Sequence, residues 1–500
     1  MKRIPFYVKM LLSLVLLLVP VLAVAGKIQL PQTGQTACYN ATGNEIACPN
    51  TGQDGDSRAG VAWPNPRFRD NGDGTILDNL SGLIWAKNGN VMKTRDPGFD
   101  TDGFIAGDGA VTWQHALAYI KKLNSENYLG HNDWRLPNII ELDSLVHAGQ
   151  SSQAVWLNLQ GFSNVQENYY WSSTTLVYYD WNARIVNMYG GFMDFDSKSS
   201  NGYYVWPVRS ENSVSTISLP RTGQTTCYDE YSAIDCAGTG QDGELQTGAA
   251  WPDPRFRDNG DLTMTDNLTG LVWTRDANAP GPTSCDPGTS KNWQGALNYV
   301  KCLNMNNYLG HNDWRLPNRK ELRSLVDEQQ QQLVDFLNFI GFYDVKFGSY
   351  WSSTTYAYNA TDAWTVDMYY GAFEYDSKSD YNYNYVWPVR SIPLIQVTPV
   401  SLNFGHVPVG STKDLFLTVK NSGDGTLTGS ATTSAPFSIV SGGSYSLLAG
   451  QRQVVTIRYQ PTAKGAHAGT VVFTGGGGAT IPVSGTTKAG LPWLLLLLGD

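Results

Sequence analysis

One eleven-residue segment occurs twice in this chain without change, and this repeat constrains the fold more than any other feature. Tyr128–Asn138 reads YLGHNDWRLPN, and Tyr308–Asn318 has the same letters. Other segments recur in the same order: WPNPRFRDNGD from Trp63 returns as WPDPRFRDNGD from Trp251, and YWSSTT at 170–175 returns at 350–355. Solenoid repeats are only about 20–50 residues long. A period of roughly 180 residues therefore indicates two tandem copies of one domain.

The repeats and the composition divide the chain into five segments. Residues 1–25 form a signal peptide, because Lys2, Arg3 and Lys9 precede an apolar run and an A-x-A cleavage site. The first copy spans residues 27–212 and the second spans residues 214–392. Residues 395–487 alternate apolar and polar between Gly, Asn and Ser turns, which predicts an all-β immunoglobulin-like sandwich. Residues 488–500 form an apolar tail too short for a bilayer, so we expect no membrane span in the mature chain.

Each copy combines helical and strand patterns, which predicts an α+β fold. Apolar residues at helical spacing run from Trp113 to Leu123 and again from Trp293 to Leu303. Asn138 and Glu141 have the spacing of a capping box that begins a second helix. Residues 67–70 and 75–78 flank an Asn-Gly/Asp-Gly turn, which predicts a hairpin. Aromatic-rich strands are expected at 169–175, 183–189, 191–195 and 203–208.

Six cysteines predict three disulfides in an oxidising compartment. The pairs Cys38/Cys48 and Cys227/Cys236 hold matching positions in the two copies and close short loops. Cys285 and Cys302 occur only in the second copy, so the simplest partner of each is the other. A metal cluster is the alternative, although no CxxC spacing or neighbouring histidine supports it.

The charge and the targeting signals limit the compartment and the partners. The net charge is −9 and the pI is near 5.2, and an acidic chain argues against nucleic acid as a partner. The signal peptide and the disulfides predict a secreted or cell-surface protein. Between residues 85 and 113 the first copy carries eight extra residues, because the offset between copies falls from 188 to 180. A loop that varies on a constant scaffold is a place for binding specificity, and a tolerated surface insertion is the alternative.

The segments RFRDNGDGTILDNLSGLIW, NDWRLPNIIEL, YWSSTT and VWPVR resemble the C-terminal domain of the Legionella collagen-like adhesin, a bacterial domain once of unknown function. Both copies carry them, so the resemblance covers nearly all of residues 60–391. The W-R-L-P-x-x-x-E core from Trp134 to Glu141 is also similar to the formylglycine-generating-enzyme branch of the C-type-lectin-like fold. The resemblance implies two tandem C-type-lectin-like domains that bind sulfated glycosaminoglycans at a cell surface.

Residues 395–487 resemble the choice-of-anchor D or ASPM/hydin-type immunoglobulin-like module of secreted bacterial proteins. That resemblance implies presentation or anchoring of the tandem domains, and no catalysis. A sulfated ligand favours a basic patch, and the acidic sequence shows no obvious one.

The repeated motif contains candidates for acid–base chemistry: His131, Asp133 and Arg135, with His311, Asp313 and Arg315 in the second copy. No Ser or Cys nucleophile shares the motif, and a buried pair between Arg135 and Glu141 would explain the turn without chemistry. The formylglycine-generating enzymes need free thiols, and the expected disulfides leave none. We therefore expect a binding protein and not an enzyme.

Calcium is the one cofactor that the sequence suggests. Hard oxygen ligands lie at close spacing in both hairpins: Asp70, Asp73 and Asp78, and then Asp258, Asp261 and Asp266. The spacing lacks the glutamate at position twelve of an EF-hand. Hairpin turns use the same residues for backbone reasons, so an ordinary turn is the alternative.

The YWSSTT motif suggests a sugar site, because an aromatic ring can stack on a pyranose while hydroxyl groups bond its polar edge. Its candidate residues are Trp171, Ser172, Ser173 and Thr174, with Trp351, Ser352, Ser353 and Thr354 in the second copy. A half-buried strand would have the same sequence. We interpret the chain as a secreted or surface-exposed adhesin-like protein that recognises polysaccharide, with duplication raising avidity. A structural matrix or appendage component that binds a surface protein is the alternative.

Overall fold

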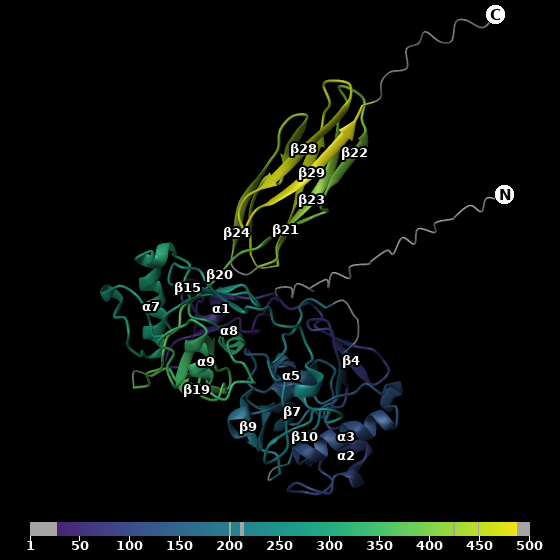
Figure 1. Ribbon diagram of the computed structural model, residues 1–500, viewed down its shortest axis with the longest axis vertical. Coiled ribbons are helices and arrows are strands. Elements are labelled where there is room, and N and C mark those ends of the chain that lie inside the picture. Colours follow the sequence, from purple (N-terminus) through teal and green to yellow (C-terminus); the bar gives the residue numbers. More distant parts are fainter. Residues whose placement is uncertain are drawn as a thin grey trace, which may run out of the picture.

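The computed structural model describes residues 28–199, 202–210, 215–379, 381–423, 426–448 and 450–487. The predicted signal peptide (residues 1–25) and apolar tail (residues 488–500) lie outside these ranges. The described chain is mostly β-structure with few helices, and Figure 1 shows two adjoining copies of the repeat with a sandwich that projects from them. None of its helices combines the length and the apolar character that crossing a membrane requires.

The first copy follows the sequence pattern closely. Its hairpin pairs Phe68 with Asp78 and Asp70 with Ile76, as the turn predicts. Helix α4 begins with the predicted capping box between Asn138 and Glu141. The elements are β1 (Cys38–Tyr39), β2 (Glu45–Ile46), α1 (Asp54–Ser57), β3 (Phe68–Asp70), β4 (Thr75–Asp78), β5 (Leu83–Ala86), α2 (Val91–Arg95), η1 (Pro97–Phe99), β6 (Ala110–Val111), α3 (Trp113–Ser125), η2 (Tyr128–Gly130), α4 (Ile139–Ser144), α5 (Gln153–Leu159), β7 (Tyr169–Thr175), η3 (Val177–Tyr179), β8 (Asn182–Asn187), β9 (Met193–Ser197), β10 (Tyr203–Tyr204) and β11 (Val208–Ser210).

The second copy repeats this order with small differences. Its hairpin and its capping box, Asn318 with Glu321, match those of the first copy. The elements are β12 (Cys227–Tyr228), β13 (Ala233–Ile234), α6 (Asp242–Leu245), β14 (Phe256–Asp258), β15 (Thr263–Asp266), β16 (Leu271–Thr274), η4 (Thr283–Cys285), α7 (Trp293–Met305), η5 (Tyr308–Gly310), α8 (Arg319–Ser324), α9 (Leu333–Phe339), β17 (Ser349–Thr355), β18 (Asp362–Asp367), β19 (Phe373–Ser377) and β20 (Val389–Ser391).

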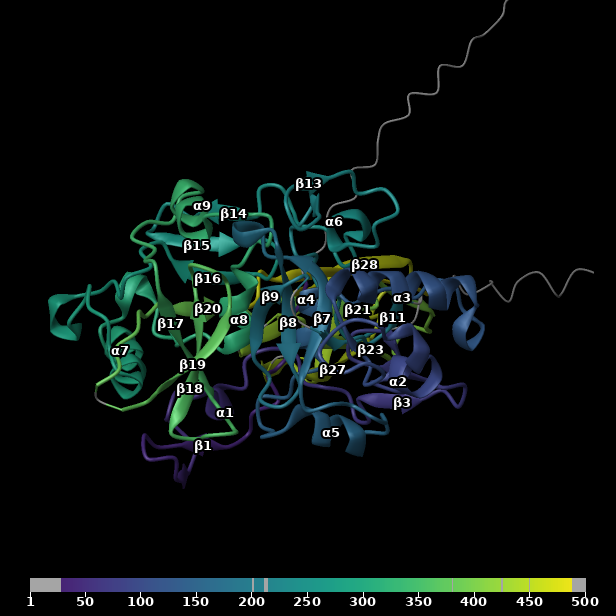
Figure 2. The ribbon, with the colours of Figure 1, turned by 90° about the horizontal axis from the view of Figure 1, so that it is seen from below.

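The two copies share one eight-stranded sheet, in the order β17-β18-β19-β9-β8-β7-β10-β6. It crosses from one copy to the other where Phe373 of β19 pairs with Met193 of β9 in antiparallel register. We call this contact the seam. Figure 2 shows the strands of both copies on the side away from the sandwich, which lies behind them. One hydrophobic core cluster contains residues of both copies, so the tandem domains are not independent.

The first part of each copy lies across the other copy. We call residues 28–62 arm 1 and residues 217–250 arm 2. The side-chain amide of Gln35 in arm 1 exchanges two hydrogen bonds of 2.8 Å with the backbone of Thr355 in the second copy. Gln224 in arm 2 bonds the backbone of Thr175 in the first copy in the same way, at 3.0 and 2.8 Å. This reciprocal exchange interlocks the copies.

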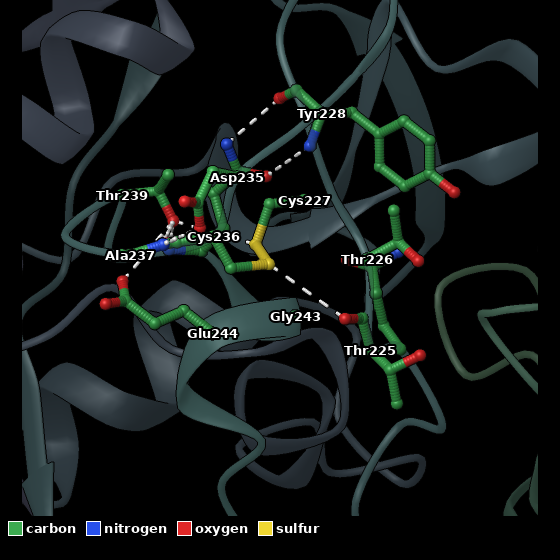
Figure 3. Close-up of a disulfide and its surroundings, with 12 residues drawn as sticks. Thr225, Thr226, Cys227, Tyr228, Asp235, Cys236, Ala237, Thr239, Gly243 and Glu244 are labelled. Atoms are coloured by element: carbon green, nitrogen blue, oxygen red, sulfur yellow. Dashed lines mark hydrogen bonds between the residues drawn. A yellow bond between two sulfur atoms is a disulfide. The ribbon is translucent and has the colours of Figure 1, made fainter.

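Three disulfides have the predicted pairing: Cys38–Cys48 in arm 1, Cys227–Cys236 in arm 2 and Cys285–Cys302 between η4 and α7. Figure 3 shows the arm 2 disulfide. The Glu244 carboxylate beside it accepts hydrogen bonds from the N–H groups of Gly238 and Gly240, at 2.6 and 2.7 Å. The disulfide therefore closes a loop that its own hydrogen bonds already organise.

Residues 395–487 form the predicted all-β sandwich in their described part. Its sheets have the orders β21-β23-β27-β25 and β22-β29-β28-β24-β26. In the core between them Phe437 stacks on Tyr459, and the tilted ring of Phe404 packs against both. The strands are β21 (Ile395–Thr398), β22 (Leu402–His406), β23 (Lys413–Asn421), β24 (Leu427–Thr432), β25 (Phe437–Ser441), β26 (Ser444–Leu447), β27 (Arg452–Tyr459), β28 (Ala466–Phe473) and β29 (Ala479–Thr486).

Candidate functional site

The residues predicted to line a sugar site are core residues, which corrects the sequence interpretation. Each of them has an exposed fraction of 1% or less: Trp171, Ser172, Ser173, Thr174, Trp351, Ser352, Ser353 and Thr354. The indole N–H of Trp171 donates to the Val111 carbonyl and the Ser172 hydroxyl donates to the Arg184 carbonyl. No ligand can reach these atoms in this fold, because the YWSSTT motif is a packed strand.

The threonines of that motif hold the arms instead. Thr174 donates to the carboxylate of Asp242 in arm 2 at 2.7 Å, and Thr354 donates to Asp54 in arm 1 at 2.8 Å. Burial raises the pKa of Asp54 to about 6 and that of Asp242 to about 7, although the threonine hydrogen bonds act in the opposite direction. These two carboxyl groups are thus part of the contact between the copies.

The copies carry complementary charges where they meet. Asp143 of α4 pairs with Arg319 of α8 at 2.7 Å, and Arg184 of β8 pairs with Glu328 at 2.9 Å. All four side chains are more than nine-tenths buried. The repeat places Arg323, Ile139, Trp364 and Ala148 at the positions equivalent to Asp143, Arg319, Arg184 and Glu328. Two identical copies could not form these pairs, because each pair needs one residue of the first copy and one of the second.

The acid–base candidates are engaged in separate structural contacts. Arg135 forms the predicted buried pair with Glu141, through hydrogen bonds of 2.5 and 2.7 Å. Asp133 bonds Arg209 at 2.8 Å, and the His131 ring lies edge-on to Trp134. The second copy repeats these contacts in the pairs Arg315–Glu321, Asp313–Arg390 and His311–Trp314. A structural role accounts for the whole motif.

The predicted calcium ligands do not converge. Asp78 lies in the core and accepts hydrogen bonds from Arg67 at 3.0 and 3.1 Å, and its equivalent Asp266 is bonded by Arg255. Asp70 pairs with Lys87, and Asp258 pairs with Arg275. Asp73 and Asp261 accept from the N–H groups that close their turns. The described part of the chain contains no group of three or more Asp, Glu, His or Cys side chains that could hold a metal ion, which corrects the prediction of a site at these hairpins.

A groove lies on the seam and is built by both copies. It encloses about 360 Å³ and is lined by Tyr169, Phe192, Met193, Asp194, Ala372, Phe373, Glu374 and Tyr375. Asp194 and Glu374 hold equivalent positions in the repeat, as do Met193 and Phe373. We call it the seam groove. Its strands β9 and β19 lie on the side of the tandem unit away from the sandwich (Figure 1, Figure 2).

The seam groove is acidic. None of its lining residues is basic, and Asp194 and Glu374 are both exposed on their strands. Partial desolvation raises the pKa of each carboxyl. The Phe195 N–H and the charge of Arg184 act in the opposite direction on Asp194, whereas repulsion from Asp367 and Asp194 adds to the rise of the Glu374 pKa. Carboxylates in such a site can accept hydrogen bonds from hydroxyl or ammonium groups and repel anions.

Aromatic rings from both copies frame the seam groove. Phe192 lies 5.2 Å from Tyr375, and Tyr375 stacks on Tyr356 at 4.6 Å between ring centroids. The hydroxyl groups of Tyr189 and Tyr358 bond across the copies at 2.8 Å. Tyr375 is 46% exposed, so its ring is available to a ligand although its inner edge packs against other rings.

Sequence reasoning missed the seam groove, because its walls come from residues about 180 positions apart in the chain. One signal was present in the repeats: α4 reads IIELDS where α8 reads RKELRS. Divergence at equivalent positions of a repeat indicates a contact that the two copies make differently.

Comparison with protein families gives two matches. The model of the Lcl C-terminal domain matches residues 74–209 and 262–390, more than half of the chain, and leaves both arms outside. The ASH model, described as "Abnormal spindle-like microcephaly-assoc'd, ASPM-SPD-2-Hydin", matches residues 390–480. A search of curated proteins gave no match.

Two solved structures are similar to part of this chain. The ASH/PapD-like domain 7 of human CEP192 is 17% identical with a TM-score of 0.18, and the match covers 19% of this chain and 87% of that one. A Porphyromonas gingivalis protein of unknown function is 15% identical with a TM-score of 0.18, and the match covers 25% and 63% of the two chains.

Proposed function

Because the chain belongs to the family of the Lcl C-terminal domain, we propose that it is an adhesin-like bacterial surface protein that recognises polysaccharide at the seam groove. The observation that carries this proposal is the groove itself, which combines the exposed ring of Tyr375 and the half-buried rings of Tyr169 and Phe192 with two carboxylates. Aromatic faces pack on sugar rings, and carboxylates accept hydrogen bonds from hydroxyl groups. The predicted role is binding and not catalysis.

The charge of the groove narrows the ligand class. Asp194 and Glu374 repel a sulfated chain, whereas they attract a sugar that carries hydroxyl or ammonium groups. We therefore propose a neutral or amine-bearing polysaccharide and not the sulfated glycosaminoglycan that the family resemblance implies. On this proposal duplication serves to build one composite groove, and not two separate sites that add avidity.

The position of the sandwich supports display. The ASH family model matches the sandwich over residues 390–480. The sandwich projects from the tandem unit on the side away from β9 and β19 (Figure 1). An anchoring or presenting sandwich would leave the seam groove facing outward. Three disulfides agree with an extracellular location. We retain the C-type-lectin-like fold of the two copies as a proposal that rests on the W-R-L-P-x-x-x-E motif.

A glycan array tests this function. The mature chain would be screened with calcium and with EDTA, beside Tyr375→Ala and Glu374→Gln. Loss of a stacking ring or of a charged acceptor should weaken binding at least about tenfold. The control is Tyr381→Ala, which removes a tyrosine that is 91% exposed and lies outside the groove lining.

Three results decide the outcome. Saturable binding to uncharged or amine-bearing glycans that is lost in both groove variants supports the proposal. Binding that Tyr375→Ala leaves unchanged would place the site elsewhere. Loss with EDTA tests the prediction of calcium, which would then need ligands other than the two hairpin triads.

A protein partner is the second candidate. Leu159 and Phe339 hold equivalent positions at the ends of α5 and α9 and are 78% and 88% exposed. Exposed apolar side chains favour protein contacts. If no glycan binds in either buffer, a Leu159→Ser and Phe339→Ser variant should lose cross-linking to surface proteins of the producing cell, while the wild type retains it.

A further inference from the structure

Two pairs of tyrosines connect the copies outside the lining of the seam groove. The first pair is Tyr189 with Tyr358, whose hydroxyl oxygens lie 2.8 Å apart. The second pair is Tyr178 with Tyr369, whose hydroxyl groups are also hydrogen-bonded to each other. The repeat relates the two pairs, because Tyr358 is the equivalent of Tyr178 and Tyr369 is the equivalent of Tyr189. The structure therefore makes the same contact twice, once in each direction between the copies.

Each pair joins a loop of one copy to a loop of the other. Tyr189 lies between β8 and β9 of the first copy, and Tyr358 lies between β17 and β18 of the second. Tyr178 lies in η3, between β7 and β8, and Tyr369 lies between β18 and β19. One tyrosine of each pair thus shortly precedes a strand of the seam, β9 or β19.

The rings of each pair meet at their hydroxyl edges. The ring centroids are 4.9 Å apart in the Tyr189–Tyr358 pair and 5.0 Å apart in the Tyr178–Tyr369 pair, with interplanar angles of 58° and 56°. The ortho carbon of a phenol neighbours the carbon that bears the oxygen. A contact between the two oxygens therefore also brings ortho carbons of the two rings close together.

Both pairs are partly open to solvent. Tyr189 and Tyr358 are 37% and 49% exposed, and Tyr178 and Tyr369 are half-buried. An oxidant in solution can therefore reach these phenols. Water can bond hydroxyl groups at such positions as well, so the hydrogen bonds between the phenols contribute little net stability.

The tyrosines are common to both copies although the loops around them differ. Residues 177–181 read VYYDW and their equivalents 357–361 read AYNAT, so the tyrosine at the second position is the one residue that the two loops share. What the copies have in common here is the contact between tyrosines and not the loop that carries it.

We propose that both pairs are sites of oxidative cross-linking to dityrosine. A haem peroxidase with hydrogen peroxide removes one electron and one proton from each phenol, and the two phenoxyl radicals couple through their ortho carbons. One carbon–carbon bond forms, and the hydrogens of the coupled carbons move to the phenol oxygens. The chain loses two hydrogen atoms for each cross-link, and the peroxide takes them up to become two molecules of water.

Such a bond connects parts of the fold that the disulfides leave unconnected. Each of the three disulfides closes a short loop within one copy, whereas a link from Tyr189 to Tyr358 spans 169 residues and joins the two copies. A cross-link between distant residues restricts the unfolded chain. The oxidised protein should therefore unfold at a higher urea concentration than the untreated protein. The inference does not depend on what the seam groove binds.

Peptide mapping of the oxidised full mature chain tests these sites. Dilute protein is treated with a haem peroxidase and hydrogen peroxide, the monomer is isolated, and its tryptic peptides are analysed by mass spectrometry. Tyr189 lies in the peptide 185–198, Tyr178 lies in 136–184, and the partners of both lie in 347–378. We expect 347–378 to be linked to each of the other two peptides. Each link should lower the summed mass by two hydrogen atoms and survive reduction with a thiol.

A single variant removes one link and keeps the other. Tyr358→Phe retains the ring without the hydroxyl group that forms the radical, so it should lose the link to peptide 185–198 and keep the link to 136–184. Tyr381→Phe is the matched control, because Tyr381 is 91% exposed and belongs to neither pair. It should leave both links intact.

The remaining outcomes decide against the proposal. An oxidised monomer without a link between the copies would overturn it. Dityrosine that forms only between chains, through Tyr381, would also overturn it, because exposure and not geometry would then select the tyrosines. A link to 185–198 that persists in Tyr358→Phe would overturn the assignment of this pair. If Tyr358→Phe fails to fold, Tyr189→Phe must lose the same linked peptide in its place.

Discussion

Replacing Asp54 by asparagine tests whether a buried carboxyl group controls the docking of arm 1. Asp54 accepts hydrogen bonds from Thr33 of its own arm at 2.6 Å and from Thr354 of the second copy at 2.8 Å. Asparagine has nearly the same shape and retains an oxygen acceptor, but it cannot ionise. The variant therefore removes the charge and preserves most of the contact.

The magnitude follows from the pKa. Burial raises the pKa of Asp54 from 3.8 to about 6, so the folded protein binds this proton more tightly than the unfolded chain. The resulting stabilisation is complete below the unfolded value and is lost as the pH rises from 3.8 through about 6. At about 1.4 kcal/mol for each pH unit, the loss is about 3 kcal/mol. For Asp242, with a pKa of about 7, the same reasoning gives about 4 kcal/mol.

The assay must isolate this one group. Burial lowers the pKa of His147 to about 4, so His147 destabilises the fold as the pH falls and partly hides the effect of Asp54. The useful quantity is the difference between Asp54→Asn and wild type in urea unfolding from pH 4 to pH 8. Between pH 4 and pH 8 the free energy of unfolding of the variant should gain about 3 kcal/mol relative to that of wild type. Asp253→Asn is the control, because Asp253 is exposed and the first copy has Asn65 there.

Hydrogen exchange gives the local test. The N–H of Thr355 donates to Gln35 of arm 1, whereas the N–H of Thr175 donates to Gln224 of arm 2. In Asp54→Asn the exchange protection factor of the Thr355 amide should no longer fall with rising pH. The protection factor of the Thr175 amide should still fall, as it does in wild type. If the stability difference between variant and wild type is the same at pH 4 and pH 8, the argument from burial is refuted.

Two further stability predictions use urea unfolding as well. Replacing Cys285 and Cys302 together by serine opens a loop of 17 residues and should cost about 3 kcal/mol, with a faster exchange of amide protons in α7 under native conditions. Asp143→Ala leaves Arg319 buried without its ion-pair partner and should lower the free energy of unfolding by about 3–5 kcal/mol. Adding Arg319→Ile, which copies Ile139 of the first copy, should restore most of that loss. If the double variant recovers no stability, the role assigned to the pair is contradicted.

Local features of the fold were predictable from the sequence. The capping boxes at Asn138 and Asn318, the hairpin turns and the disulfide pairs depend on residues close together in the chain. The buried pair of Arg135 with Glu141 also followed from spacing. The YWSSTT motif was misread as a sugar site, because the same aromatic and hydroxyl residues serve a packed strand and an exposed site.

The sequence by itself determined that the chain contains two copies of one unit, three disulfides and a sandwich, because repeats, periodicity and cysteine positions are visible along the chain. The tertiary structure alone decided how the copies meet. Asp54 and Thr354 lie 300 positions apart, and no local pattern shows that an arm crosses to the other copy. The seam groove likewise depends on how the copies meet, since it takes its walls from β9 of the first copy and β19 of the second.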